Sequence, residues 1–171
     1  LLSVLLCAVL TAKAQTYTIS WGYCNASSVT NIFGEATSAK GAIYIPAEIA
    51  KIYQGAKVTG VRVGFGNNAT NVKIFVSEDL NGAPVIEEST TDCVRGMKNI
   101  SFTTGSYTIT EKGFYVGYSC TSATADSPIG ISDLYDENGC WADLGDGWKN
   151  YSADPAYKSS ALCIFARIKG D

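Results

Sequence analysis

The amino-acid sequence predicts an all-β protein, a two-sheet antiparallel β-sandwich of jelly-roll-like type with one short helix. In several runs hydrophobic residues alternate with polar or small ones, which is typical of strands that turn one face toward a core. Turn-forming residues separate these runs at intervals of about ten residues, the spacing of a sandwich. Only one segment reads as a helix, so the crossover helices that a parallel sheet needs are missing.

Four runs give the clearest strand signal, because a hydrophobic side chain occupies nearly every second position. They are residues 61–65, 72–77, 114–118 and 162–168. The segments that punctuate the chain are rich in Gly, Asn and Asp, which favour turns: Gly66-Asn67-Asn68, Asn81-Gly82, Lys112-Gly113 and Gly145-Asp146-Gly147.

Asn81-Gly82 lies between two strand-like runs and therefore predicts a β-hairpin. Pro84 comes just before the second run, residues 85–89, and cannot donate a backbone hydrogen bond, so we expect that strand at a sheet edge. The short helix is expected at residues 46–53. Pro46 suits a first helical position, and Gly55 suits the residue that ends a helix.

Residues 1–14, LLSVLLCAVLTAKA, resemble the remains of a secretory signal peptide. The apolar run is too short to cross the ~30 Å hydrocarbon core of a bilayer as a helix. Ala12 and Ala14 are small residues at the positions that a signal peptidase recognises, so cleavage is expected before Gln15. A buried amphipathic helix is the alternative. We therefore divide the chain into a signal peptide, residues 1–14, and a β-sandwich domain, residues 15–171, secreted or held at the cell surface.

Composition argues against a nucleic-acid-binding protein and against a transmembrane segment after the leader. Charged residues make up 17% of the chain and the net charge is -3, whereas nucleic-acid binding requires a dense positive surface. No second apolar run is long enough for a transmembrane segment. The part after the predicted leader has the length of one domain and can bury a core without relying on disulfides.

Five cysteines follow the predicted leader, which itself contains Cys7: Cys24, Cys93, Cys120, Cys140 and Cys163. Export would permit disulfides, and the sequence leaves their pairing open. Cys163 falls within a predicted strand, so we expect it as a buried, inert thiol, while the other four lie near loops or strand ends where pairing fits. The absence of CxxC pairs and of histidine argues against a zinc site.

The chain contains no histidine, which excludes Ser-His-Asp and Cys-His catalysis and HExxH metal sites. A hydrolase that uses two carboxyl groups remains an alternative. Its candidate acids lie mostly in expected loops: Glu87, Glu88, Asp133, Asp136, Glu137, Asp143 and Asp146. We expect a non-enzymatic protein with no catalytic residues.

The densest group of aromatic and acidic residues lies between positions 132 and 157. We predict a ligand-binding site here, formed by Trp141, Asp143, Asp146, Trp148 and Tyr151. Aromatic rings offer flat surfaces to sugar rings or protein partners, and the carboxylates bind hydroxyl groups. The alternative is that both tryptophans cap the open end of the sandwich and the acids are solvated turns. No cofactor is expected, although Asp143 and Asp146 could hold a structural calcium ion with backbone carbonyls, without the spacing of an EF-hand.

Residues 40–46, 53–62 and 114–118, with Trp148 shortly before the last strand, resemble β-sandwich modules of secreted surface proteins from anaerobic gut and oral bacteria. In those proteins the modules often precede fibronectin-like domains, sorting tails or streptopain-type peptidase domains. The resemblance implies a non-catalytic module for adhesion that binds a glycan or a cell-surface protein. The alternative is a structural or interaction module accessory to another domain of a larger surface protein or peptidase. The sequence leaves the ligand and the oligomeric state open.

Overall fold

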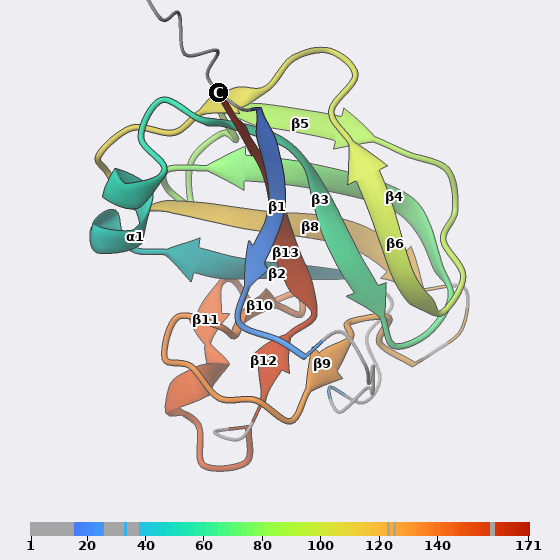
Figure 1. Cartoon of the computed structure of the whole chain (residues 1–171). Helices are drawn as coiled ribbons and strands as arrows, with labels where there is room; N and C mark the ends of the chain where they lie inside the picture. Colours follow the sequence, from blue (N-terminus) through green and yellow to red (C-terminus); the bar gives the residue numbers. More distant parts are fainter. Residues whose placement is uncertain (1–15, 26–32, 34–37, 123, 125, 158–159) are drawn as a thin grey trace, which may run out of the picture.

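Two antiparallel β-sheets face each other across a hydrophobic core in the computed structural model of the chain (Figure 1). The structure describes residues 16–25, 33, 38–122, 124, 126–157 and 160–171. It confirms the predicted all-β, two-sheet antiparallel sandwich with one short helix. The predicted signal peptide lies outside the described residues. Within the described part of the chain, no helix is long and apolar enough to cross a membrane.

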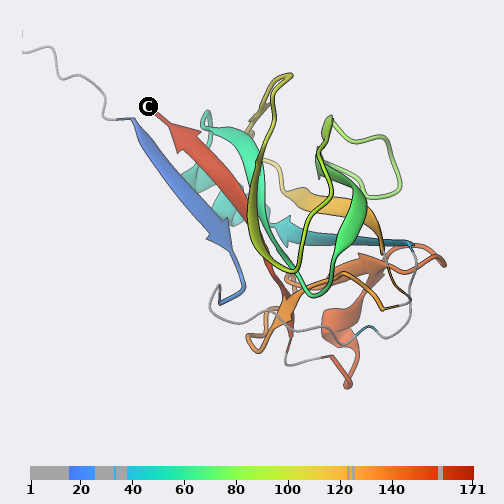
Figure 2. The ribbon, with the colours of Figure 1, turned by 90° about the vertical axis from the view of Figure 1, so that its right-hand side faces the viewer.

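The first sheet has five strands and forms the front layer in Figure 1. Its order is β1 (Tyr17–Gly22), β13 (Ile164–Gly170), β3 (Lys57–Phe65) and β6 (Gly96–Ser101), and β7 (Tyr107–Thr108) also pairs with β3. Figure 2 shows β1 running along β13 at the edge of this sheet. Every pairing in the sheet is antiparallel.

The second sheet has six strands and forms the back layer. Its order is β11 (Lys149–Asn150), β10 (Trp141–Asp143), β2 (Ser38–Ile45), β8 (Phe114–Ser122), β4 (Ala69–Ser77) and β5 (Ile86–Ser89). A separate ribbon pairs β9 (Ile131–Ser132) with β12 (Ala161–Leu162), and the 3-10 helix η1 (Tyr151–Ala153) follows β11.

The chain crosses from one sheet to the other at most of its long connections. Strands β1, β2, β3 and β4 alternate between the two sheets, and so do β5, β6 and β8. Crossing of this kind is the feature of a jelly roll. The β4–β5 hairpin around Asn81-Gly82 stays within one sheet, which confirms the predicted hairpin, and β5 lies at the sheet edge as Pro84 indicated.

The predicted helix is present as α1 (Ala47–Ile52), with one correction at its start. Pro46 has an extended backbone and caps the helix from outside, rather than forming its first residue. Its carbonyl oxygen accepts hydrogen bonds from the N–H groups of Ile49 and Ala50, at 3.0 and 2.9 Å. Gly55 follows with a φ of +86°, a conformation that favours glycine, and the helix does not continue.

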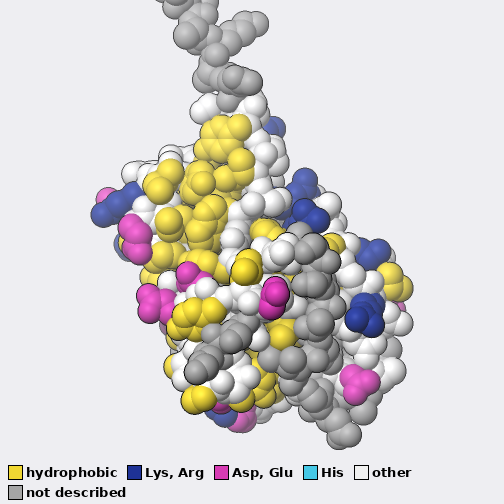
Figure 3. Space-filling view, turned by 60° about the horizontal axis from the view of Figure 1, so that its bottom comes forward, with side chains coloured by type: hydrophobic (Ala, Val, Ile, Leu, Met, Phe, Trp, Pro, Cys, Tyr) yellow, Lys and Arg dark blue, Asp and Glu magenta, His cyan; other side chains and the backbone are white. Residues whose placement is uncertain are grey.

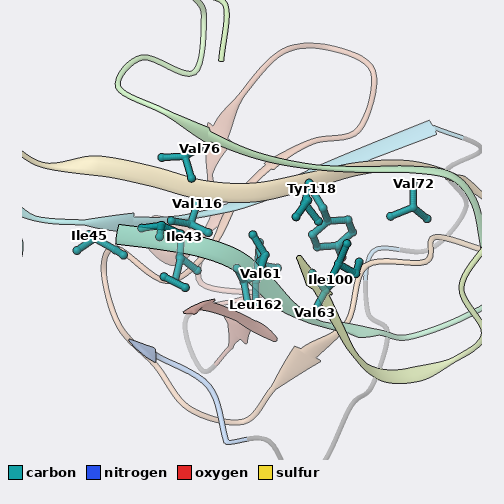
Figure 4. Close-up of a cluster of buried hydrophobic side chains, with 14 of the residues drawn as sticks. Ile43, Ile45, Val61, Val63, Val72, Val76, Ile100, Val116, Tyr118 and Leu162 are labelled. Carbon is teal, nitrogen blue, oxygen red and sulfur yellow. The ribbon is translucent and has the colours of Figure 1, made fainter. Parts of the chain in front are cut away.

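The core lies between the sheets, where side chains from both point toward one another (Figure 4). Ile43 and Ile45 of β2 and Val116 of β8 meet Val61 and Val63 of β3, and all of them are fully buried. These are the inward positions of the period-two pattern, so the alternation in the sequence predicts which residues fill the core.

All five cysteines after the predicted leader are buried. Cys163 does not lie inside a strand as predicted. It separates β12 from β13, because its backbone bonds to two different segments there. Its N–H group donates to the Gly130 carbonyl at 2.9 Å, and its carbonyl accepts from Gly64 at 2.7 Å.

Candidate functional site

The outer face of the six-stranded sheet is aromatic where an exposed sheet face is usually polar. Alternation along β2 and β8 turns Ile43 and Val116 inward, so Tyr44 and Tyr115 point outward. In the same way Phe75 is an outward residue of β4. Aromatic side chains at outward positions would expose apolar surface to water. Here they pack against other rings in two separate groups.

The first group consists of Tyr44, Tyr115 and Trp141. The rings of Tyr44 and Tyr115 have centroids 4.8 Å apart, and Tyr115 meets Trp141 edge to face at 5.6 Å. Trp141 lies on this face because β10 pairs with β2, with Trp141 opposite Ala42. The indole Nε1 of Trp141 is buried and has no hydrogen-bond partner among the described residues. A buried donor without a partner is uncommon, since it loses its bond to water.

The second group holds Trp148, which comes from the loop between β10 and β11. Its ring meets Phe75 edge to face at a centroid distance of 6.1 Å, and Lys40 Nζ lies 5.9 Å from its centroid. Gly117 makes the arrangement fit, because a Cβ atom there would lie 2.7 Å from Phe75 Cζ. Contacts with a ring and a cation fix an indole on the sheet surface. We call Trp148, Phe75 and Lys40 the Trp148 platform.

A hollow of about 180 Å³ lies beside the platform. Its lining combines the platform with the polar residues Ser77, Ser119 and Glu87, although the Ser77 hydroxyl already donates to the Asp79 carbonyl, and the hairpin turn around Gly82 and Pro84 closes one side. Pockets for drug-sized ligands usually measure about 300–1,000 Å³. The hollow is therefore suited to one ring of a ligand whose remainder lies outside.

Charges on this face are paired. Glu87 accepts a hydrogen bond from Lys73 at 2.9 Å, and Asp143 accepts one from Lys40 at 3.0 Å. Each pair joins opposite charges in partial contact with solvent, where such pairs contribute little to stability. Their effect here is to leave the face with polar groups and little net charge.

Asp143 holds the loop that carries Trp148. Its Oδ1 accepts hydrogen bonds from the N–H groups of Gly145 and Gly147, at 2.9 and 3.1 Å, and both glycines have positive φ. Burial acts to raise the pKa of Asp143, but these bonds and the Lys40 ammonium outweigh it and leave the pKa below its usual value. Among the residues that the structure describes, no cluster of three or more His, Cys, Asp or Glu residues could hold a metal ion.

The five predicted binding residues do not all meet. Trp141, Asp143 and Trp148 lie on the outer face of the six-stranded sheet. The tryptophans therefore do not cap the open end of the sandwich, which was the alternative to a binding site. Asp146 is exposed in the loop and forms an ion pair with Lys149. Tyr151 packs edge to face against Phe33 and Tyr157, away from the platform, with both centroids 5.2 Å from its own.

Sequence reasoning missed Lys40, Phe75, Ser77 and Ser119, which lie far from Trp148 in the chain, and it named Glu87 only among the candidate acids of a hydrolase. One feature of the sequence, the position of Phe75, could have indicated this part of the site. Phe75 interrupts the alternation of β4 with a large apolar side chain at an outward position, and it is nevertheless only 5% exposed. An outward aromatic residue of this kind indicates that another segment covers it.

A second surface is apolar. We define the β1–α1 patch by Tyr17, Ile19 and Trp21 of β1 with Ile52 and Tyr53 at the end of α1. Ile52 is 69% exposed and Tyr17 is 37% exposed. Figure 3 shows hydrophobic side chains gathered in the area of these two elements. Exposed hydrophobic side chains that gather on one surface are candidates for contact with another protein.

No protein-family model, curated protein or solved structure matches the chain. Its function is therefore inferred from the two surfaces and from the groups that line the hollow.

Proposed function

We propose that the protein is a secreted, non-catalytic module that binds a glycan at the Trp148 platform. The observation that carries the proposal is the ring of Trp148, held beside a hollow that also presents Ser77, Ser119 and Glu87. A sugar ring has an apolar face of C–H groups and a rim of hydroxyls. An aromatic surface with convergent hydrogen-bonding groups matches both parts.

The charge pattern favours a neutral ligand rich in hydroxyl groups. Glu87 and Asp143 already bind lysine ammonium groups, so a strongly charged ligand would have to compete with these pairs. Hydroxyl groups can instead donate to the carboxylates and accept from the lysines without breaking the pairs. A neutral oligosaccharide is the class of ligand that this arrangement suits.

The carboxyl groups support a binding role over hydrolysis. A general acid in a glycosidase needs a raised pKa. Hydrogen bonds from the Thr103 hydroxyl and N–H groups, with others from Thr104, lower the pKa of Glu88, and the pKa of Asp143 is lowered as well. A lowered pKa does not suit either group to act as the general acid of a glycosidase.

Trp148→Ala is expected to weaken glycan binding by about 30-fold, the equivalent of the ~2 kcal/mol that a well-packed aromatic anchor contributes. A glycan array identifies the ligand of the unaltered protein, and isothermal titration calorimetry then compares the two proteins. Circular dichroism confirms that the variant is folded. Equal affinity in both proteins, or no glycan bound by either, contradicts the proposal.

The matched control is Ile52→Glu, which places a charge on the β1–α1 patch at a strongly exposed position. We expect it to leave glycan binding unchanged.

The apolar patch favours a second candidate function, an interaction module that packs against another domain of a surface protein. Attachment to cells that is lost with Ile52→Glu and kept with Trp148→Ala would assign the function to the patch instead.

We also propose export, on the basis of the leader-like residues 1–14. Protein expressed from a gene that includes this segment is expected outside the cytoplasm, with an intact mass that begins at Gln15. Mass spectrometry of the exported fraction measures this. A chain that stays in the cytoplasm with the leader attached would contradict it.

A further inference from the structure

Cys24 and Cys163 lie just beyond the last positions at which β1 and β13 pair, Gly22 and Phe165. The register runs from Tyr17 opposite Gly170 to Gly22 opposite Phe165, one residue at a time on each strand. Two further steps in the same register place Cys24 opposite Cys163. The cysteines are far apart in the chain, and the antiparallel pairing brings them together.

The backbone bonds of Cys163 define the type of this pair. Its N–H and carbonyl groups bond to Gly130 and Gly64, both away from β1. With the register extended to them, the two cysteines take the positions of a non-hydrogen-bonded pair, the type of cross-strand pair in which Cα atoms are about 4.5 Å apart and side chains approach most closely. Disulfides span Cα separations of about 4.4–6.8 Å.

The side chains are in contact. Cys24 and Cys163 share a small buried cluster with Ala161 and Phe165. A side-chain hydrogen bond joins the two cysteines, so both sulfur atoms point into the same space. Cys163 is fully buried and Cys24 is 8% exposed, which leaves Cys24 as the sulfur that a reagent reaches first.

We propose that Cys24 and Cys163 are a site of disulfide formation that fastens the edge strand β1 to β13. The oxidant is a disulfide compound, RSSR, such as glutathione disulfide or the active-site disulfide of a thiol oxidoreductase. The Cys24 thiolate attacks RSSR and releases one RS⁻. Cys163 loses its proton and attacks Cys24 Sγ, which releases the second RS⁻. Two protein thiols and RSSR thus become one protein disulfide and two RSH.

The surroundings of the two sulfur atoms suit Cys24 to attack the oxidant first and Cys163 to attack second. The hydrogen bond from Cys163 and the positive charge of Arg62 hold the pKa of Cys24 below its usual value, against the effect of burial. The same hydrogen bond, followed by burial, raises the pKa of Cys163, which acts second. Burial raises the pKa values of Cys120 and Cys140 to about 12, so these thiols react slowly.

The bond would secure a strand that depends on a single neighbour. Among the described strands, β1 pairs with β13 alone. A disulfide between residues so distant in the chain also restricts the unfolded state strongly. The site lies on the five-stranded sheet, whereas the Trp148 platform lies on the six-stranded sheet, so failure of one proposal leaves the other intact.

The experiment oxidises the folded full chain in a Cys7→Ser background, so that only the five cysteines after the leader take part. Incubation with glutathione disulfide is expected to lower the intact mass by ~2 Da, the loss of two hydrogens. Peptide mapping without reductant is expected to show Cys24 linked to Cys163. The midpoint of thermal unfolding is expected to rise by on the order of 10 °C.

Cys24→Ser and Cys163→Ser are each expected to remove the linked peptide and the rise in the midpoint. Cys140→Ser is the matched control and is expected to keep both. If Cys163→Ser does not fold, Cys24→Ser and the peptide map of the unaltered chain decide the matter. A folded protein that keeps all its thiols in the oxidant, or a link between other cysteines, overturns the proposal.

Discussion

Phe65→Ala is expected to lower the free energy of unfolding by about 3–5 kcal/mol, the cost of truncating a fully buried aromatic ring. Phe65 lies at the end of β3, is fully buried, and meets Tyr118 edge to face with centroids 5.2 Å apart. Tyr118 is fully buried as well, so the truncation opens a cavity in the interior and not at the surface. The cavity would lie between the two sheets, where rigid strands cannot collapse into it.

Urea denaturation followed by circular dichroism measures this change. Since domains are typically stable by about 5–15 kcal/mol, the variant loses a large fraction of its total stability. Val94→Ala is the control, because Val94 is 58% exposed and its truncation is expected to change stability by less than about 0.5 kcal/mol. A loss below about 1 kcal/mol for Phe65→Ala would contradict the packing of the two sheets around this ring.

The core positions were predictable from the sequence because a strand's side chains alternate by geometry alone. The run around Val61 and Val63 shows this: the apolar residues are buried, and Arg62 between them turns to the other face. The Asn81-Gly82 hairpin was predictable for a similar reason, since its turn depends on local backbone preferences. Both signals are contained within a few consecutive residues.

The candidate site was predictable only in part, because long-range pairing builds it. Trp148 and Tyr151 are three positions apart, yet β11 lies between them and Tyr151 begins η1, so the two rings have different surroundings. The short strand β10 exists through its pairing with β2, in which Asp143 lies opposite Lys40. These two residues are 103 positions apart in the chain. No local pattern marks such a contact.

The break between β12 and β13 at Cys163 also could not be predicted from the local sequence. Its neighbours Leu162 and Ile164 continue a regular alternation, which predicts one uninterrupted strand. The chain instead changes partners at this residue, from β9 to β1 and β3. The change depends on where Gly130 and Gly64 lie in space, and that position is set by the whole sandwich.

Gly117→Ala is expected to lower the free energy of unfolding by about 1–3 kcal/mol and to weaken glycan binding at the Trp148 platform. Gly117 lies on β8, in the middle of the six-stranded sheet and between β2 and β4. An added Cβ would clash with the Gly41 carbonyl oxygen, and it would lie 2.7 Å from Phe75 Cζ and 2.9 Å from Ala42 Cβ. The ring can move away only by leaving its place under Trp148.

Phe75 supports Trp148 from the outer face and is not part of the core cluster between the sheets, so a loss of glycan affinity in folded protein reports on the platform. Denaturation measures the stability, and calorimetry measures the glycan affinity on protein that circular dichroism shows to be folded. Gly105→Ala is the matched control, because its Cβ would meet Ile86 Cδ1 at 3.5 Å, an ordinary contact. A Gly117→Ala protein that binds glycan with full affinity would show that Trp148 does not depend on Phe75 for its position, and the binding surface would then have to be sought elsewhere on the sheet.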